Sequence, residues 1–195
     1  MKSSIFIAAN NLKKVGHLPF LGLLLAGLCF GGLVYAKTAK EIDASVDVAL
    51  ERFHNQVAGA KEFAKNAKGL LVLPSVKKAA FIVGGEYGEG ALRIDGKTAG
   101  YYNLVSGSFG LQIGAQAKDI IIAFMTDEAL TAFRASEGWE AGVDGNIALI
   151  TIGAGGRVDT TTVRDPIVGF VFDVKGLMAD VSLKGAKITK LDKPK

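Results

Sequence analysis

The chain has 195 residues, of which 49% are hydrophobic, and this composition excludes a disordered protein and suits one globular domain with a short extra segment. Its formal net charge is +4. Residues 1–36 contain three lysines and no acidic residue, so the rest keeps 20 of the 23 basic residues against 19 acidic ones, a net charge of about +1. A balance this close to neutral, without an aromatic-rich basic motif, argues against nucleic-acid binding.

Residues 1–36 have the pattern of a secretory signal peptide. Three lysines precede the uncharged apolar run Leu18–Val34, and Val34-Tyr35-Ala36 offers small residues where a signal peptidase cleaves. We therefore expect export to the periplasm and a single mature domain of residues 37–195. The run approaches the length of a membrane span, so a retained anchor is the alternative. A lipid anchor at Cys29 is disfavoured because Leu28, which is not a small residue, precedes it.

Two helices are predicted to open the mature domain. In Ala39–Val57, apolar residues recur at spacings of three and four and so share one face: Ile42, Val46, Leu50, Phe53 and Val57. Gly59 interrupts this helix, and a second helix, Ala60–Lys68, ends at Gly69.

From Leu70 onward the hydrophobic pattern is typical of short strands. We expect them at Leu70–Leu73, Ala79–Val83, Gly90–Ile94, Tyr101–Val105, Phe109–Ala115, Ile120–Met125, Ile147–Ile152, Ile167–Val174, Leu177–Leu183 and Ala186–Leu191. Turns are expected after Pro74 and across the glycines of 84–90, and Asp95-Gly96 is a hairpin signal. Within Phe109–Gln116, Gly110 and Gly114 share one face with Gln112 and Gln116, and such a glycine face would let another backbone or a helix approach closely. One helix, Asp127–Ser136, interrupts the strands, with Thr126 as its cap.

This order predicts an α+β fold. An N-terminal helical hairpin would pack on a strongly curved, mainly antiparallel sheet with one inserted helix, and the pattern leaves open whether the sheet closes like a barrel. The strands have too few helices between them for a doubly wound parallel sheet.

No motif points to catalysis, a metal or a cofactor. Gly85–Gly90 reads G-x-x-G-x-G before a strand, which is not a nucleotide-binding loop. Glu86 and Glu89 fit exposed loop charges better than a glycosidase pair. His54 fits a solvated helix residue, and the mature part has no cysteine. We expect a binding protein and not an enzyme.

Five lysines form the candidate lipid-binding site. Lys61, Lys65 and Lys68 lie at helical spacing, and Lys77 and Lys78 follow in the turn expected after Pro74. If that turn folds back beside the helix, five ammonium groups face one membrane surface. The alternative is an ordinary solvated helix face. Tyr101, Tyr102 and Trp139 fit core packing better than membrane anchoring.

Several motifs, in order and spacing, resemble those of the SYLF family. They are Ala67-Lys-Gly-Leu-Leu-Val-Leu-Pro74, Gly84-Gly-Glu-Tyr-Gly-Glu-Gly90, Gly107-Ser-Phe-Gly-Leu-Gln-Ile-Gly-Ala-Gln116, the helix 127–136, Gly142-Val-Asp144 and the run 175–185. The resemblance runs from about Ala39 to Leu183. It implies phospholipid binding; eukaryotic members favour phosphoinositides and some bundle actin, whereas bacterial members resemble this chain in carrying an export signal.

Two functional hypotheses follow. The first is an exported module that binds anionic phospholipid at a membrane surface. The second is a protein-interaction module, related to the actin-binding branch of the family. A cavity that holds an acyl chain inside a closed sheet is a variant of the first.

Overall fold

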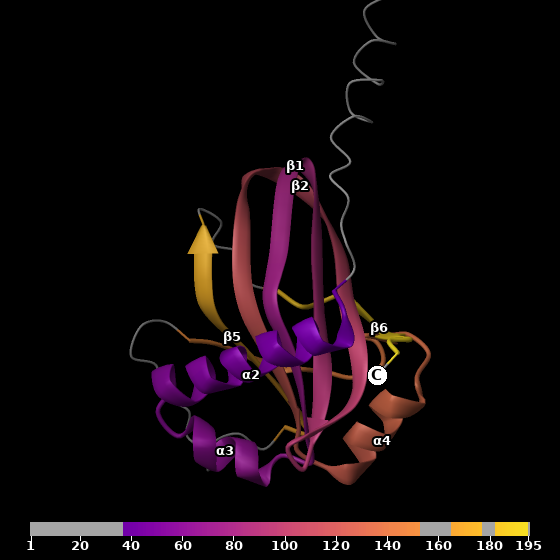
Figure 1. Ribbon diagram of the computed structural model, residues 1–195. Helices are drawn as coiled ribbons and strands as arrows, with labels where there is room; N and C mark the ends of the chain where they lie inside the picture. Colours follow the sequence, from indigo (N-terminus) through magenta and orange to yellow (C-terminus); the bar gives the residue numbers. More distant parts are fainter. Residues whose placement is uncertain (1–36, 153–164, 177–181, 195) are drawn as a thin grey trace, which may run out of the picture. The chain divides into compact units, whose positions relative to one another are not determined.

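A long hairpin organises the structure. The computed structural model describes residues 37–152, 165–176 and 182–194, so the predicted leader, with its cleavage site and Cys29, lies outside the described residues. Strands β1 (Gly69–Ile94) and β2 (Lys97–Phe124) pair antiparallel along nearly their whole length (Figure 1). The predicted turn at Asp95-Gly96 joins them, with φ angles of 49° and 73°.

Six strands of the described residues form one sheet in the order β3–β6–β2–β5–β4, and β1 pairs with β2. Strands β6 (Lys187–Leu191) and β5 (Ile167–Gly176) run antiparallel to the first and second halves of β2. Strand β3 (Trp139–Glu140) pairs antiparallel with β6, whereas β4 (Ala148–Thr151) pairs parallel with β5. The predicted α+β fold with a strongly curved, mainly antiparallel sheet is confirmed, and the sheet reaches a half-barrel.

Two of the predicted turns are strand instead. β1 runs through both Pro74 and the glycines of 84–90 and so joins three predicted strands, as β2 does with the next three. Pro74 is tolerated because the register shifts between Leu73 and Val76, where its missing N–H costs no ladder hydrogen bond. The predicted strand 177–183 falls mostly outside the described residues, and Leu183 is not in a strand.

β1 folds back on itself. Val72 and Gly90 would stand roughly 60 Å apart in a straight strand. Yet a Cβ atom added to Gly90 would lie 2.8 Å from the carbonyl carbon of Val72, and one added to Gly88 would lie 3.2 Å from the Cα of Val76. Figure 1 shows both long strands rising away from the helices, turning over and returning. Gly88 and Gly90 permit this close approach because glycine has no side chain. The sequence pattern had predicted a close backbone approach at 109–116 instead.

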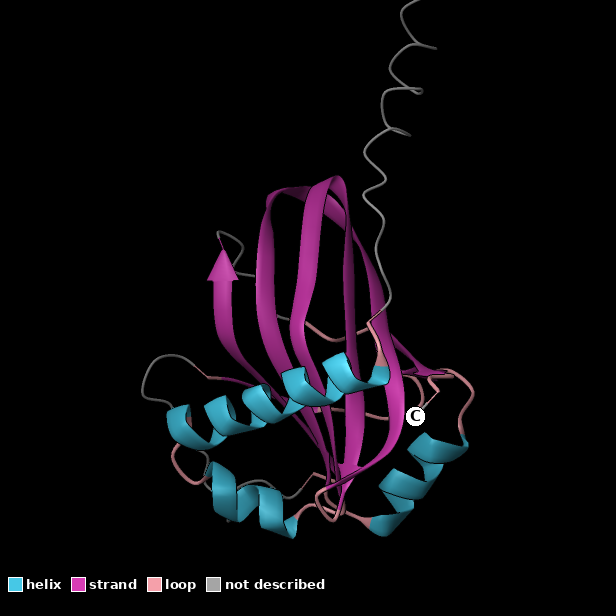
Figure 2. Ribbon diagram, in the orientation of Figure 1, coloured by secondary structure: helices cyan, strands magenta, loops and turns pink. Residues whose placement is uncertain are grey.

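Three helices of the described residues pack on the sheet (Figure 2). Helix α2 (Ala39–Gln56) begins at Thr38, which forms a capping box with Glu41. The short helix α3 (Ala60–Asn66) follows, and α4 (Asp127–Ala135) is capped by Thr126, whose hydroxyl accepts from the Ala129 N–H. All three predicted helices are confirmed, with ends that differ by one or two residues.

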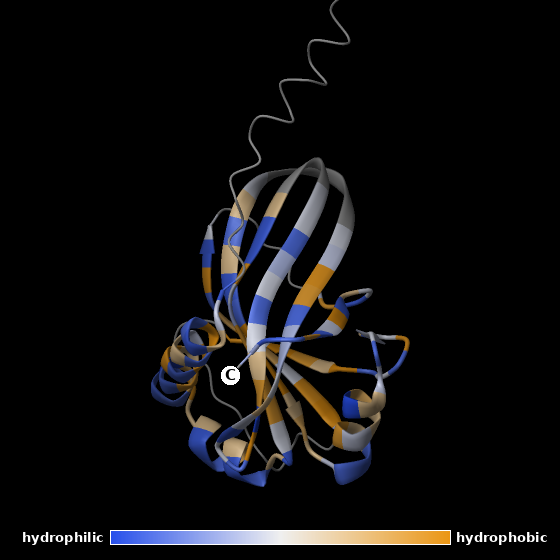
Figure 3. Ribbon diagram, turned by 45° about the vertical axis from the view of Figure 1, so that its right-hand side comes forward, coloured by the Kyte–Doolittle hydropathy of each residue, from blue (hydrophilic) through white to orange (hydrophobic). Residues whose placement is uncertain are grey.

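The helices cover opposite faces of the sheet and so create two hydrophobic cores. Alternate residues of one strand enter different cores: Val72 packs under α2 and α3, whereas Leu71 and Leu73 pack with α4. This two-sided burial explains the uninterrupted apolar runs in the sequence. The strongly hydrophobic strand residues gather mostly in the half of the sheet nearest the helices (Figure 3). Tyr101, Tyr102 and Trp139 are all buried, which confirms their assignment to the core.

An ion cluster ties α2 to three neighbouring strands. The Arg52 guanidinium lies 2.6 Å from a carboxylate oxygen of Asp119 and also contacts Asp173. The other Asp119 oxygen accepts from the Ser75 N–H at 2.8 Å. Burial raises the pKa of Asp119, although the Ser75 N–H and Arg52 act against that rise. These contacts connect the three strands at the places where the β1–β2 and β2–β5 registers shift.

Glu86 and Glu89 are buried, so their prediction as exposed loop charges is wrong. Both lie on the returning half of β1, and Glu86 pairs with the buried Lys118 of β2 at 2.8 Å. Glu89 accepts from the Tyr87 hydroxyl at 2.7 Å and the Lys37 N–H at 3.2 Å. Lys193 closes this group: its ammonium lies 3.6 Å from Glu89 and donates to the Lys37 carbonyl at 2.7 Å. Burial and the hydrogen bond to Glu89 raise the pKa of Tyr87 to about 12.

We expect the G90A substitution to destabilise the domain by about 3 kcal/mol, because its methyl group would overlap the Val72 backbone. Urea unfolding of the variant and the parent measures this change. G107A is the matched control on β2, since a Cβ atom there meets nothing within 4 Å, and it should change stability by less than about 0.5 kcal/mol. Equal stability of both variants would contradict the backbone contact.

Candidate anion-binding site

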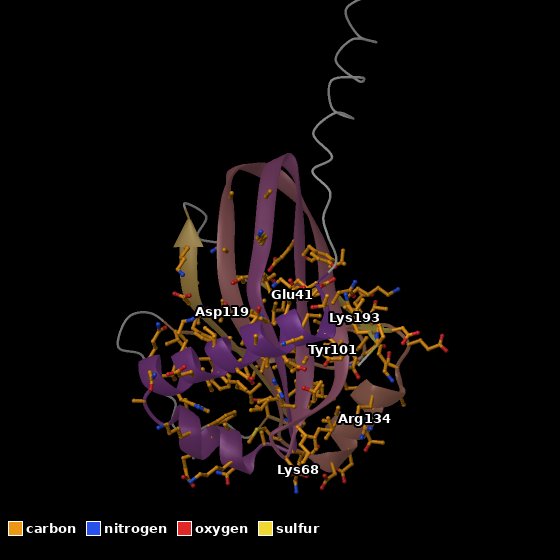
Figure 4. All side chains as sticks on the ribbon, in the orientation of Figure 1. Glu41, Lys68, Tyr101, Asp119, Arg134 and Lys193 are labelled. Carbon is orange, nitrogen blue, oxygen red and sulfur yellow. The ribbon has the colours of Figure 1, made fainter. Side chains whose placement is uncertain are left out.

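Three of the five predicted site lysines gather at one place. Lys61 and Lys65 are exposed on α3, and Lys68 follows just before β1. All three line the same pocket of about 500 Å³. The pocket is bounded by α2, α3, the two ends of β1 and the turn that joins β1 to β2. Figure 4 places Lys68 between α3 and α4, and its ammonium lies 3.4 Å from Asp127 of α4.

Lys77 and Lys78 do not join this group. The turn expected after Pro74 is strand, which carries Lys77 roughly 25 Å along β1 from Gly69. Lys77 is exposed, whereas Lys78 is only 5% exposed. The prediction that all five lysines form a single patch is therefore wrong in its geometry, and Lys61, Lys65 and Lys68 remain as the candidate residues.

Two further basic side chains line the pocket, and neither was among the predicted site residues. Arg93 comes from the end of β1 and His54 from α2. The position of His54 carries a sequence signal, because Asp47, Leu50 and His54 follow one another at helical spacing and all three line the pocket. Arg93 has no such local signal, since only the fold-back of β1 brings it beside Gly69.

The pocket is positively charged. Its lining holds four full cations, including Arg93, against the two carboxylates of Asp47 and Asp95, which leaves about +2 when His54 is neutral. Arg93 pairs with Asp47 at 2.7 Å and with Asp43 at 3.4 Å, and Lys68 pairs with Asp127, so the remaining positive charge comes mainly from Lys61 and Lys65. The site is thus suited to an anion.

Two nitrogen atoms of the pocket residues are shielded from water and have no hydrogen-bond partner among the described residues. They are Nε of Arg93 and Nε2 of His54. Buried polar atoms are rarely left unpaired. His54 is accordingly half-buried, so its assignment as a solvated histidine is wrong. Burial lowers its pKa, and the charge of Lys61 lowers it further.

We expect K61E to raise the pKa of His54, because a carboxylate replaces a repelling ammonium group. NMR titration of the imidazole, assigned with H54Q, measures the shift, and K184E is the control with the same change in charge. Since the pKa of His54 is depressed on folding, its contribution to stability is present above about pH 6.5 and is lost as the pH falls through the folded pKa. An unchanged pKa in K61E would show that Lys61 does not face the imidazole.

Other kinds of site find no support in the described residues. Between residues 37 and 194, excluding the gaps, no three histidine, cysteine, aspartate or glutamate side chains gather to hold a metal ion. No helix in that part of the chain is both long and apolar enough to cross a membrane.

Comparison with known proteins agrees with the sequence motifs. Residues 105–193, from within β2 to beyond β6, match the family model Ysc84, described as Las17-binding protein actin regulator. No curated protein matches the chain. The matched second half is consistent with the SYLF-domain family that the motifs of the first half resemble.

Proposed function

We propose that the protein is an exported module that binds anionic phospholipid at a membrane surface. The observation that carries this proposal is the gathering of Lys61, Lys65 and Lys68 around one positively charged pocket. The phospholipid binding implied by the SYLF resemblance supports it. The signal-peptide pattern of residues 1–36 supports export, and a bacterial periplasm offers anionic phospholipid on both bounding membranes.

The attraction to the membrane has to be local. Residues 37–195 carry almost no net charge, so long-range attraction by the whole domain is weak. Each lysine held close to an anionic surface contributes about 1 kcal/mol, so three acting together give about 3 kcal/mol. That is enough for reversible, salt-sensitive docking.

We expect the triple variant K61E/K65E/K68E to bind anionic vesicles at least about 100-fold more weakly, since loss of about 3 kcal/mol corresponds to that factor. Co-sedimentation with vesicles of graded anionic content, at low and high salt, measures the change. Binding by the parent should rise with anionic lipid and fall with salt.

The matched control is K184E/K187E/K190E, which reverses three exposed lysines near the C-terminus. It should bind as the parent does if docking uses the pocket. If both variants lost vesicle binding equally, the loss would reflect the change in net charge and not the pocket. Unimpaired vesicle binding by K61E/K65E/K68E would overturn the proposed surface.

A protein-interaction module is the second candidate. It is favoured by the family description, which names a Las17-binding protein and actin regulator. The matched residues 105–193 exclude α3 and its lysines, so a partner-binding surface would use β2, α4 and the later strands.

Co-sedimentation with actin filaments at low salt tests the actin branch of this alternative. Filament binding that survives in K61E/K65E/K68E would favour a protein partner on the other surface. Failure to pellet with filaments under conditions where vesicles are bound leaves the lipid proposal as the better one.

A further inference from the structure

We propose that a second pocket binds the C-terminal residue of a partner polypeptide, that is, an apolar side chain next to a free carboxylate. The pocket has a volume of about 320 Å³ and lies between the start of β4 and the segment that leads into β6. This inference deepens the second candidate function, a protein-interaction module, and rests on it. It is independent of lipid docking, because the two pockets share no lining residue among the described ones.

The floor of this pocket is the edge of a hydrophobic core that is not fully covered. Ala141 and Leu183 are 2% and 4% exposed and belong to the core that packs with α4. Ile147 and Leu149 also line the pocket and pack against the same core, but both are only half-buried. An apolar ligand side chain placed here would complete their burial, and removing this area from water favours binding.

The charge of the pocket favours an anion. Lys184 is the only charged residue among the described residues that line it, so no acidic side chain of the lining opposes a carboxylate. The Cγ atom of Lys184 lies 3.5 Å from the position that a Cβ atom would take on Gly142, which places the stem of the lysine against the turn at the rim. A carboxylate next to an apolar side chain could therefore meet the ammonium group while the side chain enters the pocket.

The surroundings of the pocket favour a polypeptide over a small free acid. Asn146 and Ser182 are exposed lining residues, and their side chains can both donate and accept hydrogen bonds, as the peptide groups of a bound backbone require. Val143 follows the lining residue Gly142 and is 73% exposed. A chain that continues out of the pocket past Gly142 would cover Val143, whereas a small acid would leave it in water.

The turn that presents Val143 is fixed by hydrogen bonds. The Asp144 N–H donates to the Glu140 carbonyl at 2.9 Å, and the Asp144 carboxylate accepts from the Glu140 N–H at 2.7 Å. The Ala141 carbonyl accepts from the Gly185 N–H at 2.9 Å, which ties this turn to the segment before β6. The two sides of the pocket are therefore joined, and a preformed surface loses little conformational freedom when a ligand binds.

The experiment titrates small probes into protein purified after expression of the full chain. The main probe is the acetylated tripeptide Ac-Ser-Gly-Leu with a free C-terminal carboxylate. Its C-terminal amide is the uncharged counterpart, and N-acetylleucine is the small free acid. The methyl signals of Ile147, Leu149 and Leu183 report on the second pocket by NMR. K184A removes the ammonium group, and K190A is the matched control, because Lys190 is exposed but does not line the pocket.

We expect saturable shifts of the three methyl signals, with the free-carboxylate tripeptide bound about tenfold more tightly than its amide. K184A should weaken binding of the carboxylate form about tenfold and leave binding of the amide unchanged, because both changes remove the same charge-assisted contact. K190A should bind both forms as the parent does. V143S retains the lysine and changes an exposed position, and it should weaken the tripeptide about threefold without affecting N-acetylleucine.

The outcomes separate this site from the second candidate function as a whole. A lack of methyl shifts with every probe, or equal binding of the carboxylate and amide forms, would overturn the site. Filament binding that persists under those circumstances would leave the protein-interaction function intact on another surface. Saturable tripeptide binding without filament binding would support the site and count against the actin branch alone. N-acetylleucine binding as tight as that of the tripeptide would overturn a polypeptide as the occupant.

Discussion

The contact between the two halves of β1 is the constraint on which the rest of the structure depends. Gly88 and Gly90 let the returning strand lie directly on the backbone of Val72 and Val76. The return brings Glu86 onto Lys118. It also carries Arg93 and the Asp95-Gly96 turn back to the start of the strand, where they complete the pocket with α2 and α3. A straight hairpin of the same sequence would have neither the Glu86–Lys118 ion pair nor the pocket.

Much of the fold could be predicted from local patterns. The three helices, the Asp95-Gly96 hairpin and the membership of Tyr101 and Trp139 in the core follow from periodicity, turn chemistry and side-chain size. The fold-back could not be predicted, because Pro74 and the glycines of 84–90 signal turns just as well as a bulge and a close contact within one strand. Lys61 and Lys65 were recognised because they are neighbours on a helix, and Lys68 because the helix was predicted to extend to it. Arg93 was missed because its neighbours in the pocket are distant in sequence.

The candidate lipid surface and the family match occupy different parts of the chain. The pocket is built from residues 47–96, whereas the family model covers 105–193. The matched part supplies most of β2 together with β5 and β6, which belong to the scaffold of the sheet. The pocket residues lie at one end of that scaffold. Members of a family can share such a scaffold while the residues that contact a ligand differ, so the site and the fold have to be argued separately.

The group around Glu89 bears on the predicted cleavage after Ala36. In the uncleaved chain, the donor to Glu89 is a neutral peptide N–H at Lys37. Cleavage after Ala36 would convert that nitrogen into an α-ammonium group, which is largely protonated near neutral pH because its usual pKa is about 7.7–8.0. Glu89, only 6% exposed, would then gain a charged partner at a site where it already meets Lys193. Charge-assisted hydrogen bonds are about twice as strong as neutral ones. Cleavage at the predicted site would thereby tie the new N-terminus to the sheet and stabilise the shortened chain.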